Sequence, residues 1–151
     1  MHATTLLLTS LAALTSATPV PSTNNYSPNN LFHIENFVFG CTTTCDWYYD
    51  ITVTNSSENH PSTGPVHCQG SLDTIKSFAD AENVCAVPSA NQHIATFIDK
   101  ETNLLQIQYR YTPGDSYEFW YEGNQTVNAA TSGKPQATDF YIPESKAYAV
   151  G

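Results

Sequence analysis

Positive charge is scarce in this sequence. Of its 151 residues only five are Lys or Arg, against 14 Asp and Glu, so the formal net charge is −9, and Arg110 is the sole arginine. Because phosphate groups are bound mainly by clusters of Lys and Arg, the composition argues against nucleic acid and anionic membranes as partners. The acidity is typical of a protein that stays soluble at mildly acidic extracellular pH.

Several chemical motifs are also missing. The sequence has no G-x-S-x-G nucleophile motif, no Gly-rich phosphate loop and no paired C-x-x-C or His-x-His spacing. Ser71 follows Gly70 without any surrounding motif. A nucleophilic triad, a nucleotide site and a metal site are therefore not expected, and no cofactor is predicted. The metal alternative that we considered rests on His67, which directly precedes Cys68.

Long apolar runs are absent as well. The run from Leu6 to Leu14 is shorter than the roughly 20 residues that a membrane-spanning helix needs. It is followed by Thr15-Ser16-Ala17, which completes the pattern of a secretory signal peptide over residues 1–17. Cleavage there would leave 151 − 17 = 134 residues, the size of one domain. Residues 18–30 are rich in Pro, Ser and Asn and are expected to form a disordered leader, so 31–151 is the predicted folded domain.

The four cysteines are expected to form two disulfides, because a secreted chain folds in an oxidising compartment. Three connectivities are available. We favour pairing of sequence neighbours, Cys41 with Cys45 and Cys68 with Cys85. In the chain-entropy model a loop the size of the second is worth roughly 3 kcal/mol.

Three N-x-S/T sequons begin at Asn25, Asn55 and Asn124. Each is a candidate glycosylation site if the chain is secreted, and a glycan requires an exposed position. The sequons are therefore expected to mark the leader and the loops.

Segments rich in β-branched and aromatic residues recur along the chain and are separated by turn residues, which predicts an all-β fold. We expect an antiparallel sandwich or barrel of about seven to eight strands, stapled by the disulfides. Residues 55–65 read as a loop, and 73–83 as one helical turn or a packed loop. The expected strands are Leu31–Phe39, Trp47–Thr54, Val66–Gln69, Gln92–Asp99, Asn103–Tyr111, Ser116–Glu122, Gln125–Ala130 and Thr138–Ile142.

One hairpin can be placed in register. Apolar residues occupy odd positions of 103–111, and aromatic residues occupy the odd positions 117, 119 and 121 of the next strand. Because cross-strand partners share a face, odd should pair with odd. This requires a loop of odd length, such as the five residues Thr112–Ser116, and places Arg110 near Glu118.

The same pairing leaves Trp120 on the polar face. It then either contributes to a binding site or is covered by the leader, a loop or a neighbouring subunit. Trp and Tyr dominate contact surfaces, although most of the nine tyrosines are expected to belong to the core and its rim. We single out Trp47, Tyr48 and Trp120 as binding candidates.

A hydrolase remains a further alternative without a specific signal. Glycoside hydrolysis needs two carboxylates flanking a cleft, but Asp115, Glu118 and Glu122 read more simply as solvated residues. A guanyl-type ribonuclease would need a Glu, an Arg and His residues acting on a phosphodiester. Arg110, which Tyr109 and Tyr111 flank, and His93 on a neighbouring strand would be its candidates. No catalytic residue is assigned.

From Leu31 to Val150 the chain resembles small secreted fungal proteins of the Alternaria major-allergen type. The resemblance rests on strand patterns and cysteine positions rather than on catalytic motifs. Its elements are Phe32-His33-Ile34-Glu35-Asn36-Phe37, Tyr49-Asp50-Ile51-Thr52-Val53-Thr54, Cys68 and Cys85, Leu104-Leu105-Gln106-Ile107-Gln108-Tyr109, and Phe140-Tyr141-Ile142-Pro143-Glu144-Ser145-Lys146-Ala147.

The resemblance implies a β-barrel or sandwich without known enzymatic activity, acting as an allergen or as an effector or elicitor that binds host-plant proteins. The pair Cys68 and Cys85 fits the family's first disulfide. The Cys41-Thr-Thr-Thr-Cys45 element and the missing C-terminal cysteine pair depart from the family, so neither its dimerisation nor its ligand site is carried over.

We therefore expect a secreted, effector-like protein that binds a host protein in the apoplast, as a monomer or a dimer. A module that binds cell-wall glycans is the second hypothesis, and a small secreted hydrolase is the third. A flat row of exposed aromatic rings near Trp47 or Trp120 would favour sugar, whereas a mixed patch would favour protein.

Overall fold

The computed structural model describes residues 31–114 and 116–151. The predicted signal peptide (1–17), the predicted leader (18–30), the sequon at Asn25 and the candidate Asp115 lie outside these described residues. Among the described residues, no helix has the length and apolar character needed to cross a membrane.

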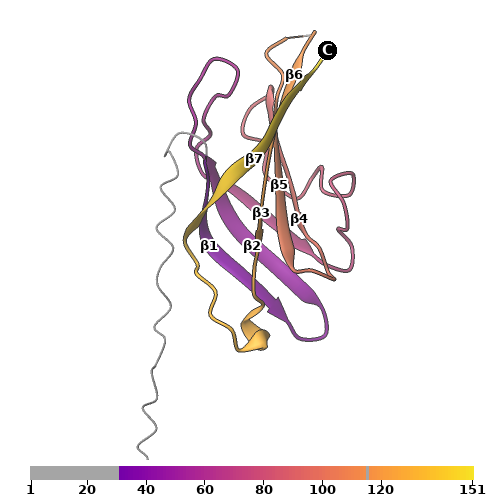
Figure 1. Cartoon of the computed structure of the whole chain (residues 1–151). Helices are drawn as coiled ribbons and strands as arrows, with labels where there is room; N and C mark the ends of the chain where they lie inside the picture. The colour runs from indigo at the N-terminus through magenta and orange to yellow at the C-terminus, as the bar shows by residue number, and fades with distance from the viewer. Residues whose placement is uncertain (1–30, 115) are drawn as a thin grey trace, which may run out of the picture.

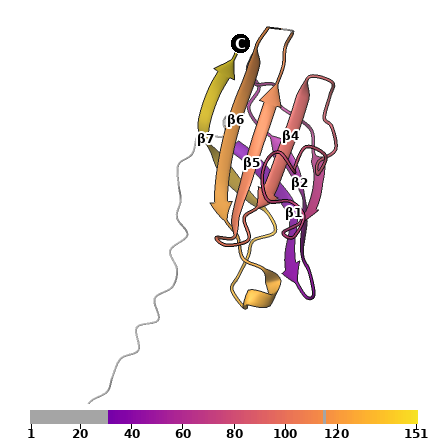
Figure 2. The same cartoon turned by 90° about the vertical axis from the view of Figure 1, so that its right-hand side faces the viewer.

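Seven antiparallel strands form one sheet that curls into a nearly closed barrel, as Figures 1 and 2 show. The order of the strands across the sheet is β3-β2-β1-β7-β6-β5-β4. This confirms the predicted all-β, antiparallel fold. The strands are β1 (Leu31–Cys41), β2 (Cys45–Val53), β3 (Val66–Ser71), β4 (Gln92–Ile98), β5 (Leu104–Tyr111), β6 (Glu118–Thr126) and β7 (Phe140–Val150), with one short 3-10 turn, η1 (Ala130–Ser132).

The β6 region differs from the sequence prediction. Two strands were expected, Ser116–Glu122 and Gln125–Ala130, but a single strand passes through Gly123. Gly123 is buried. A Cβ at this position would lie 2.8 Å from the Pro143 carbonyl oxygen and 2.9 Å from the Phe32 ring, which is too close for any larger residue. The glycine here permits close packing between strands instead of a turn.

The C-terminal strand was also predicted too short. It was expected to end at Ile142, but β7 continues to Val150 along β6. The register of β7 against β6 shifts between Glu122 and Gly123, whose partners are Lys146 and Glu144. The extra residue, Ser145, donates its hydroxyl to the Glu122 carbonyl oxygen (3.2 Å). This bulge reverses which side chains of β7 face inward.

A second register shift lies in β1, between Glu35 and Val38. Asn36 adopts a φ of 55°, in the left-handed region that Asn tolerates better than most residues. Its Nδ2 donates to Asp50 Oδ2 (2.8 Å). The shift turns Phe37 and Phe39 into the core in phase with the inward residues of β2.

The open side of the barrel, between β3 and β4, is covered by the segment 72–86. The Cys68–Cys85 disulfide joins this segment to β3, and the Gln69 amide donates to the Val84 carbonyl oxygen (2.9 Å). Phe78 packs edge-on against Phe97 of β4 (centroids 5.1 Å apart). The segment consists of turns without a helix, so the packed-loop alternative for residues 73–83 is the one observed.

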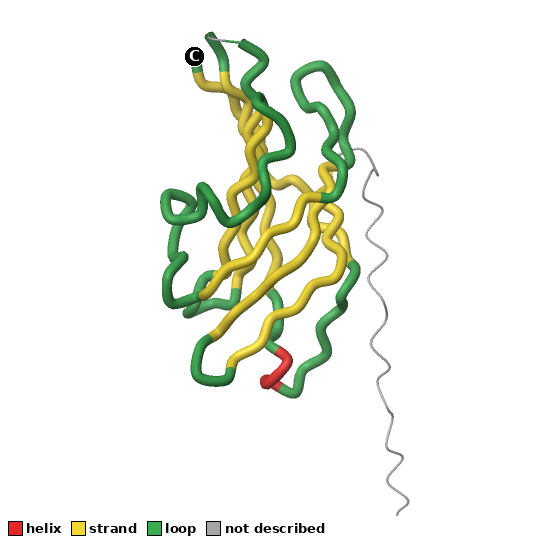
Figure 3. Tube along the Cα trace, turned by 180° about the vertical axis from the view of Figure 1, so that it is seen from behind, coloured by secondary structure: helices red, strands yellow, loops and turns green. Residues whose placement is uncertain are grey.

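The favoured cysteine pairing is confirmed. Cys41 bonds Cys45 across the turn that joins β1 to β2, and Cys68 bonds Cys85. No cysteine among the described residues is free. Figure 3 shows the β1–β2 turn and η1 at one end of the barrel, with the loop between β2 and β3 at the opposite end.

Candidate binding surface

The outward face of β5, β6 and β7 carries a row of large side chains. The register places Arg110 of β5 opposite Trp120 of β6, and Trp120 opposite Tyr148 of β7. The predicted pairing of odd with odd positions is confirmed, for example by Tyr109 opposite Tyr121. Seven residues, 112–118, separate the paired residues Tyr111 and Phe119, and the last of them, Glu118, already belongs to β6.

Arg110 therefore lies diagonally from Glu118 rather than directly opposite it, with 3.9 Å between Nη1 and Oε1. The loop has odd length as expected but is two residues longer than predicted. Proximity of the two charges was predictable from the alternation, whereas the loop length was not, because five and seven residues satisfy the alternation equally.

The Trp120 side chain lies between those of Arg110 and Tyr148. Its ring is parallel to that of Tyr148 within 2°, with centroids 6.1 Å apart, and the Arg110 guanidinium carbon lies 5.2 Å from its centroid. The Lys146 ammonium lies 4.6 Å from the Tyr148 centroid. Trp120 is half-buried, and its buried indole N–H has no hydrogen-bond partner. Residues from its own sheet thus cover part of this side chain.

Glu122 holds the polar part of this face together. Its carboxylate accepts hydrogen bonds from Gln108 (3.0 Å) and from the Tyr148 hydroxyl (3.0 Å), and it lies 3.5 Å from Lys146. Burial raises the pKa of Glu122, but these hydrogen bonds and the lysine outweigh burial and lower it below its ordinary value. Burial and the same carboxylate raise the pKa of Tyr148.

We call the set Arg110, Glu118, Trp120, Glu122, Lys146 and Tyr148 the Trp120 face. It combines two aromatic rings, two cations and two carboxylates on a solvent-facing sheet. Because a cation lies over each ring, the arrangement is a mixed patch rather than a bare row of aromatic rings.

The other two binding candidates, Trp47 and Tyr48, differ in exposure. Trp47 is 1% exposed and lies over Gly70 inside the barrel, so it offers no surface to a partner. The prediction that Trp47 is a binding residue is therefore wrong. The physical reason is its place on the inward, apolar side of β2 with Tyr49. Tyr48 points outward and is 46% exposed, with Val38 as its cross-strand neighbour.

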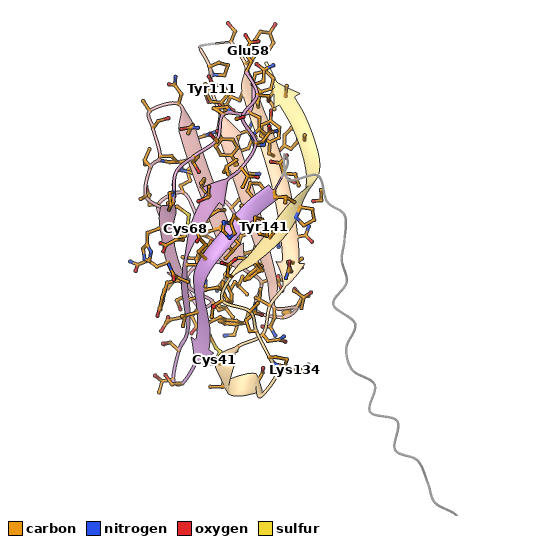
Figure 4. The ribbon with its side chains drawn as sticks, turned by 90° about the vertical axis from the view of Figure 1, so that its left-hand side faces the viewer. Cys41, Glu58, Cys68, Tyr111, Lys134 and Tyr141 are labelled. Carbon is orange, nitrogen blue, oxygen red and sulfur yellow. A yellow bond between two sulfur atoms is a disulfide. The ribbon has the colours of Figure 1, made fainter. Side chains whose placement is uncertain are left out.

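On the outward face of β1, beside β7, one histidine contacts two carboxylates. His33 lies 2.9 Å from Asp139 through Nε2 and 3.7 Å from Glu35 through Nδ1, and its ring stacks on Tyr141 (4.2 Å). Figure 4 shows Tyr141 on this side of the barrel. One nitrogen of the imidazole and one oxygen of each carboxylate lie within 4.8 Å of one another, a spacing that could hold a metal ion, although exposed acidic groups often lie this close without one.

The metal alternative at His67 does not hold, because Cys68 is consumed by its disulfide. The His67 ring instead bonds Asp50 (2.9 Å). Hydrogen bonds from Asn36 and His67 lower the pKa of the Asp50 carboxyl.

The residues of the ribonuclease hypothesis lie near one another. His93 is the cross-strand partner of Arg110, and Glu118 is on the next strand. However, His93 Nε2 is bonded to the Glu82 carbonyl oxygen (2.8 Å), and the Arg110 guanidinium lies over Trp120. Each of these groups thus has a partner within the protein.

The two described sequons differ in setting. Asn55 is half-buried and lies two residues after the end of β2, in a loop. Asn124 is exposed, as a glycan requires, but it lies within strand β6 rather than in a loop. The expectation that the sequons mark leader and loops is therefore wrong for Asn124.

Sequence reasoning missed a buried polar cluster at the end of the barrel opposite η1. His60, from the loop between β2 and β3, is 1% exposed, and its Nε2 bonds the Glu144 carboxylate, whose side chain is 6% exposed. Tyr109 and Tyr121 pack against the imidazole. Alternation from the buried Ile142 places Glu144 on the inward side of β7, but a charged residue gives no sequence sign of burial, and nothing in the sequence indicates its partner His60.

Both tyrosines of this cluster have raised pKa values. Burial is the main cause for Tyr109 and raises its pKa to about 12. Burial, followed by the negative charge of Glu144, raises the pKa of Tyr121. Both phenols are therefore neutral donors at ordinary pH.

Comparison with known proteins gives no match: no protein-family model, no curated protein and no solved structure resembles the chain significantly.

Proposed function

We propose that this protein is secreted and acts as an effector- or elicitor-like protein that binds a host protein through the Trp120 face. The observation that carries the proposal is the stack of Arg110, Trp120 and Tyr148 on the outward side of the sheet. Trp, Tyr and Arg are the residue types most often found at the energetic centres of protein interfaces.

The composition of the face supports a protein partner over a glycan. Sugars stack on freely accessible ring faces, whereas here a cation lies over each ring. The two carboxylates and two cations give the face nearly balanced charge within a chain of net charge −9. A protein surface with hydrogen-bonding and apolar groups matches this mixture.

The setting supports action outside the cell. Two disulfides are formed among the described residues, which suits an oxidising, extracellular-type environment. The predicted signal peptide over residues 1–17 and the resemblance to Alternaria major-allergen-type proteins point in the same direction.

The proposal is tested by infiltrating the purified protein into plant leaves and scoring the defence response. Trp120→Ala should lower the response at a given dose at least tenfold, because truncation of a central interface residue costs about 2 kcal/mol or more. Val87→Ala is the matched control: Val87 is 68% exposed and lies away from the face, so the variant should act like the wild type.

A glycan array run with the same three proteins separates the alternatives. Glycan binding that depends on Trp120, together with no leaf response to the wild type, would contradict the proposal and favour a carbohydrate-binding module. A leaf response that both variants retain would show that another surface is responsible.

A further inference from the structure

Residues 56–62, which we call the strap, cross the inward side of β5, β6 and β7 at the end of the barrel where Figure 4 shows Glu58. His60 is the strap's deepest side chain. Its ring centroid lies 3.8 Å from that of Tyr121 and 5.2 Å from that of Tyr109, and its Nε2 bonds Glu144. The imidazole thus occupies a space walled by two aromatic rings and a carboxylate.

The remaining contacts of the strap with these strands are few. The Tyr121 hydroxyl donates to the Asn59 carbonyl oxygen and the Tyr109 hydroxyl to that of Pro61, both at 2.8 Å. Within the described residues, the backbone of the strap pairs with itself, between Ser57 and His60, and forms no strand pairing with β5, β6 or β7. The strap is therefore held mainly by the side chains of Tyr109 and Tyr121, which donate hydrogen bonds to its backbone and pack against His60.

The walls around His60 have the properties of a cation site. A buried carboxylate needs a partner of opposite charge, and the faces of aromatic rings attract cations. The buried Nδ1 of His60 has no hydrogen-bond partner, so the contact of Nε2 with the Glu144 carboxylate is the polar interaction that holds the ring.

We propose that Tyr109, Tyr121 and Glu144 form a cation-binding cage that the His60 ring fills as an internal ligand. Displacement of the strap would open the cage to a cationic group from outside, such as an arginine or lysine side chain or a small organic cation. The net charge of −9 favours the approach of such ligands.

This cage is separate from the Trp120 face. Tyr109 and Tyr121 are paired odd-numbered residues, whereas Arg110 and Trp120 are paired even-numbered residues that project from the other side of the same strands. The cage therefore does not depend on the proposed function, and a variant in one site leaves the side chains of the other in place.

The first test is chemical rescue of His60→Gly at about pH 5.5, where free imidazole is mainly protonated. Imidazole and guanidinium should raise the Tm of the variant with a logarithmic dependence on concentration. Pyrazole, a neutral ring of the same shape, should bind at least tenfold more weakly. The double variant His60→Gly/Glu144→Gln should lose this preference for cations.

Equal rescue by pyrazole and imidazole would show a cavity that is merely filled, and would overturn the proposal. Absence of rescue in folded His60→Gly would do the same. If that variant does not fold, ¹⁵N NMR of the wild-type His60 ring at about pH 7 decides, half a unit above an ordinary histidine pKa. Both ring nitrogens protonated supports the cage, and a neutral tautomer refutes it.

Opening of the cage is tested in the wild type with tetramethylammonium. Hydrogen exchange of the amides of residues 56–62 should accelerate at least several-fold as the salt is added, while the exchange of β2 stays constant. Sodium chloride at equal concentration is the control. Equal exchange in the two salts would show that the strap is a fixed part of the fold.

Discussion

The hydroxyl groups of Tyr49 and Thr96 meet inside the barrel at 2.5 Å, although β2 and β4 are not neighbours in the sheet. The Thr96 hydroxyl donates in turn to the Gln106 carbonyl oxygen (2.8 Å), so Tyr49 is the donor in the first bond. Both residues are fully buried. This bond links the two sides of the barrel across its core.

Thr96→Val should destabilise the protein more than Tyr49→Phe. The first change leaves a buried phenol without a partner, which costs about 1–3 kcal/mol, whereas the second removes one hydrogen bond worth about 1 kcal/mol. Urea denaturation of both single variants and the double variant measures the coupling. Additive effects would show that the two hydroxyls do not interact in solution.

Gly123→Ala should destabilise the protein by about 1–3 kcal/mol, because the new Cβ would overlap the Pro143 carbonyl oxygen and the Phe32 ring. Gly64→Ala is the matched control, since nothing lies within 4 Å of a Cβ at that position. Thermal denaturation compares the two variants. A similar change in Tm for both would contradict the packing role assigned to Gly123.

How far the sequence predicts this fold is seen in β2 and β5. Alternation along 47–54 places Trp47 and Tyr49 on one apolar side, which the structure confirms as the core. Selecting Trp47 as a binding candidate ignored that pattern. On β5 the same alternation correctly predicts that odd positions pair with odd and that Trp120 lies outward, but the register differs by two residues because the loop is longer than expected.

The bulges at Asn36 and Ser145 could not be predicted, because a bulge depends on how two strands fit together rather than on either strand alone. A shift of one residue reverses every later side chain. The bulge at Ser145 therefore places Lys146 and Tyr148 on the outward side, opposite Glu122 and Trp120. Glu144, just before the bulge, contacts His60, a residue 84 positions away in sequence, and no local spacing links the two.

Loss of the Cys68–Cys85 disulfide should cost more stability than loss of Cys41–Cys45. With the chain-entropy model, the larger loop gives about 3 kcal/mol and the smaller about 2 kcal/mol. The larger bond also joins β3 to the segment that covers β4. Urea denaturation of the two double Cys→Ser variants tests the order, and a greater loss for Cys41→Ser/Cys45→Ser would contradict it.

The lowered pKa of Glu122 predicts how the Trp120 face responds to acid. Since the ionised carboxylate is favoured in the folded protein, its stabilising effect is present above the ordinary carboxyl pKa. The effect is lost as the pH falls through the lower pKa of the folded state. The wild type should therefore be more stable than Glu122→Gln near neutral pH, and the difference should shrink below about pH 4.5.

Thermal denaturation of both proteins between about pH 3 and 7 measures this difference. Glu101→Gln is the control, because Glu101 is exposed and lies away from the Trp120 face on the turn between β4 and β5. That variant should follow the wild type over the same range. A difference between wild type and Glu122→Gln that stays constant with pH would show that the hydrogen bonds to Glu122 do not favour its charged form.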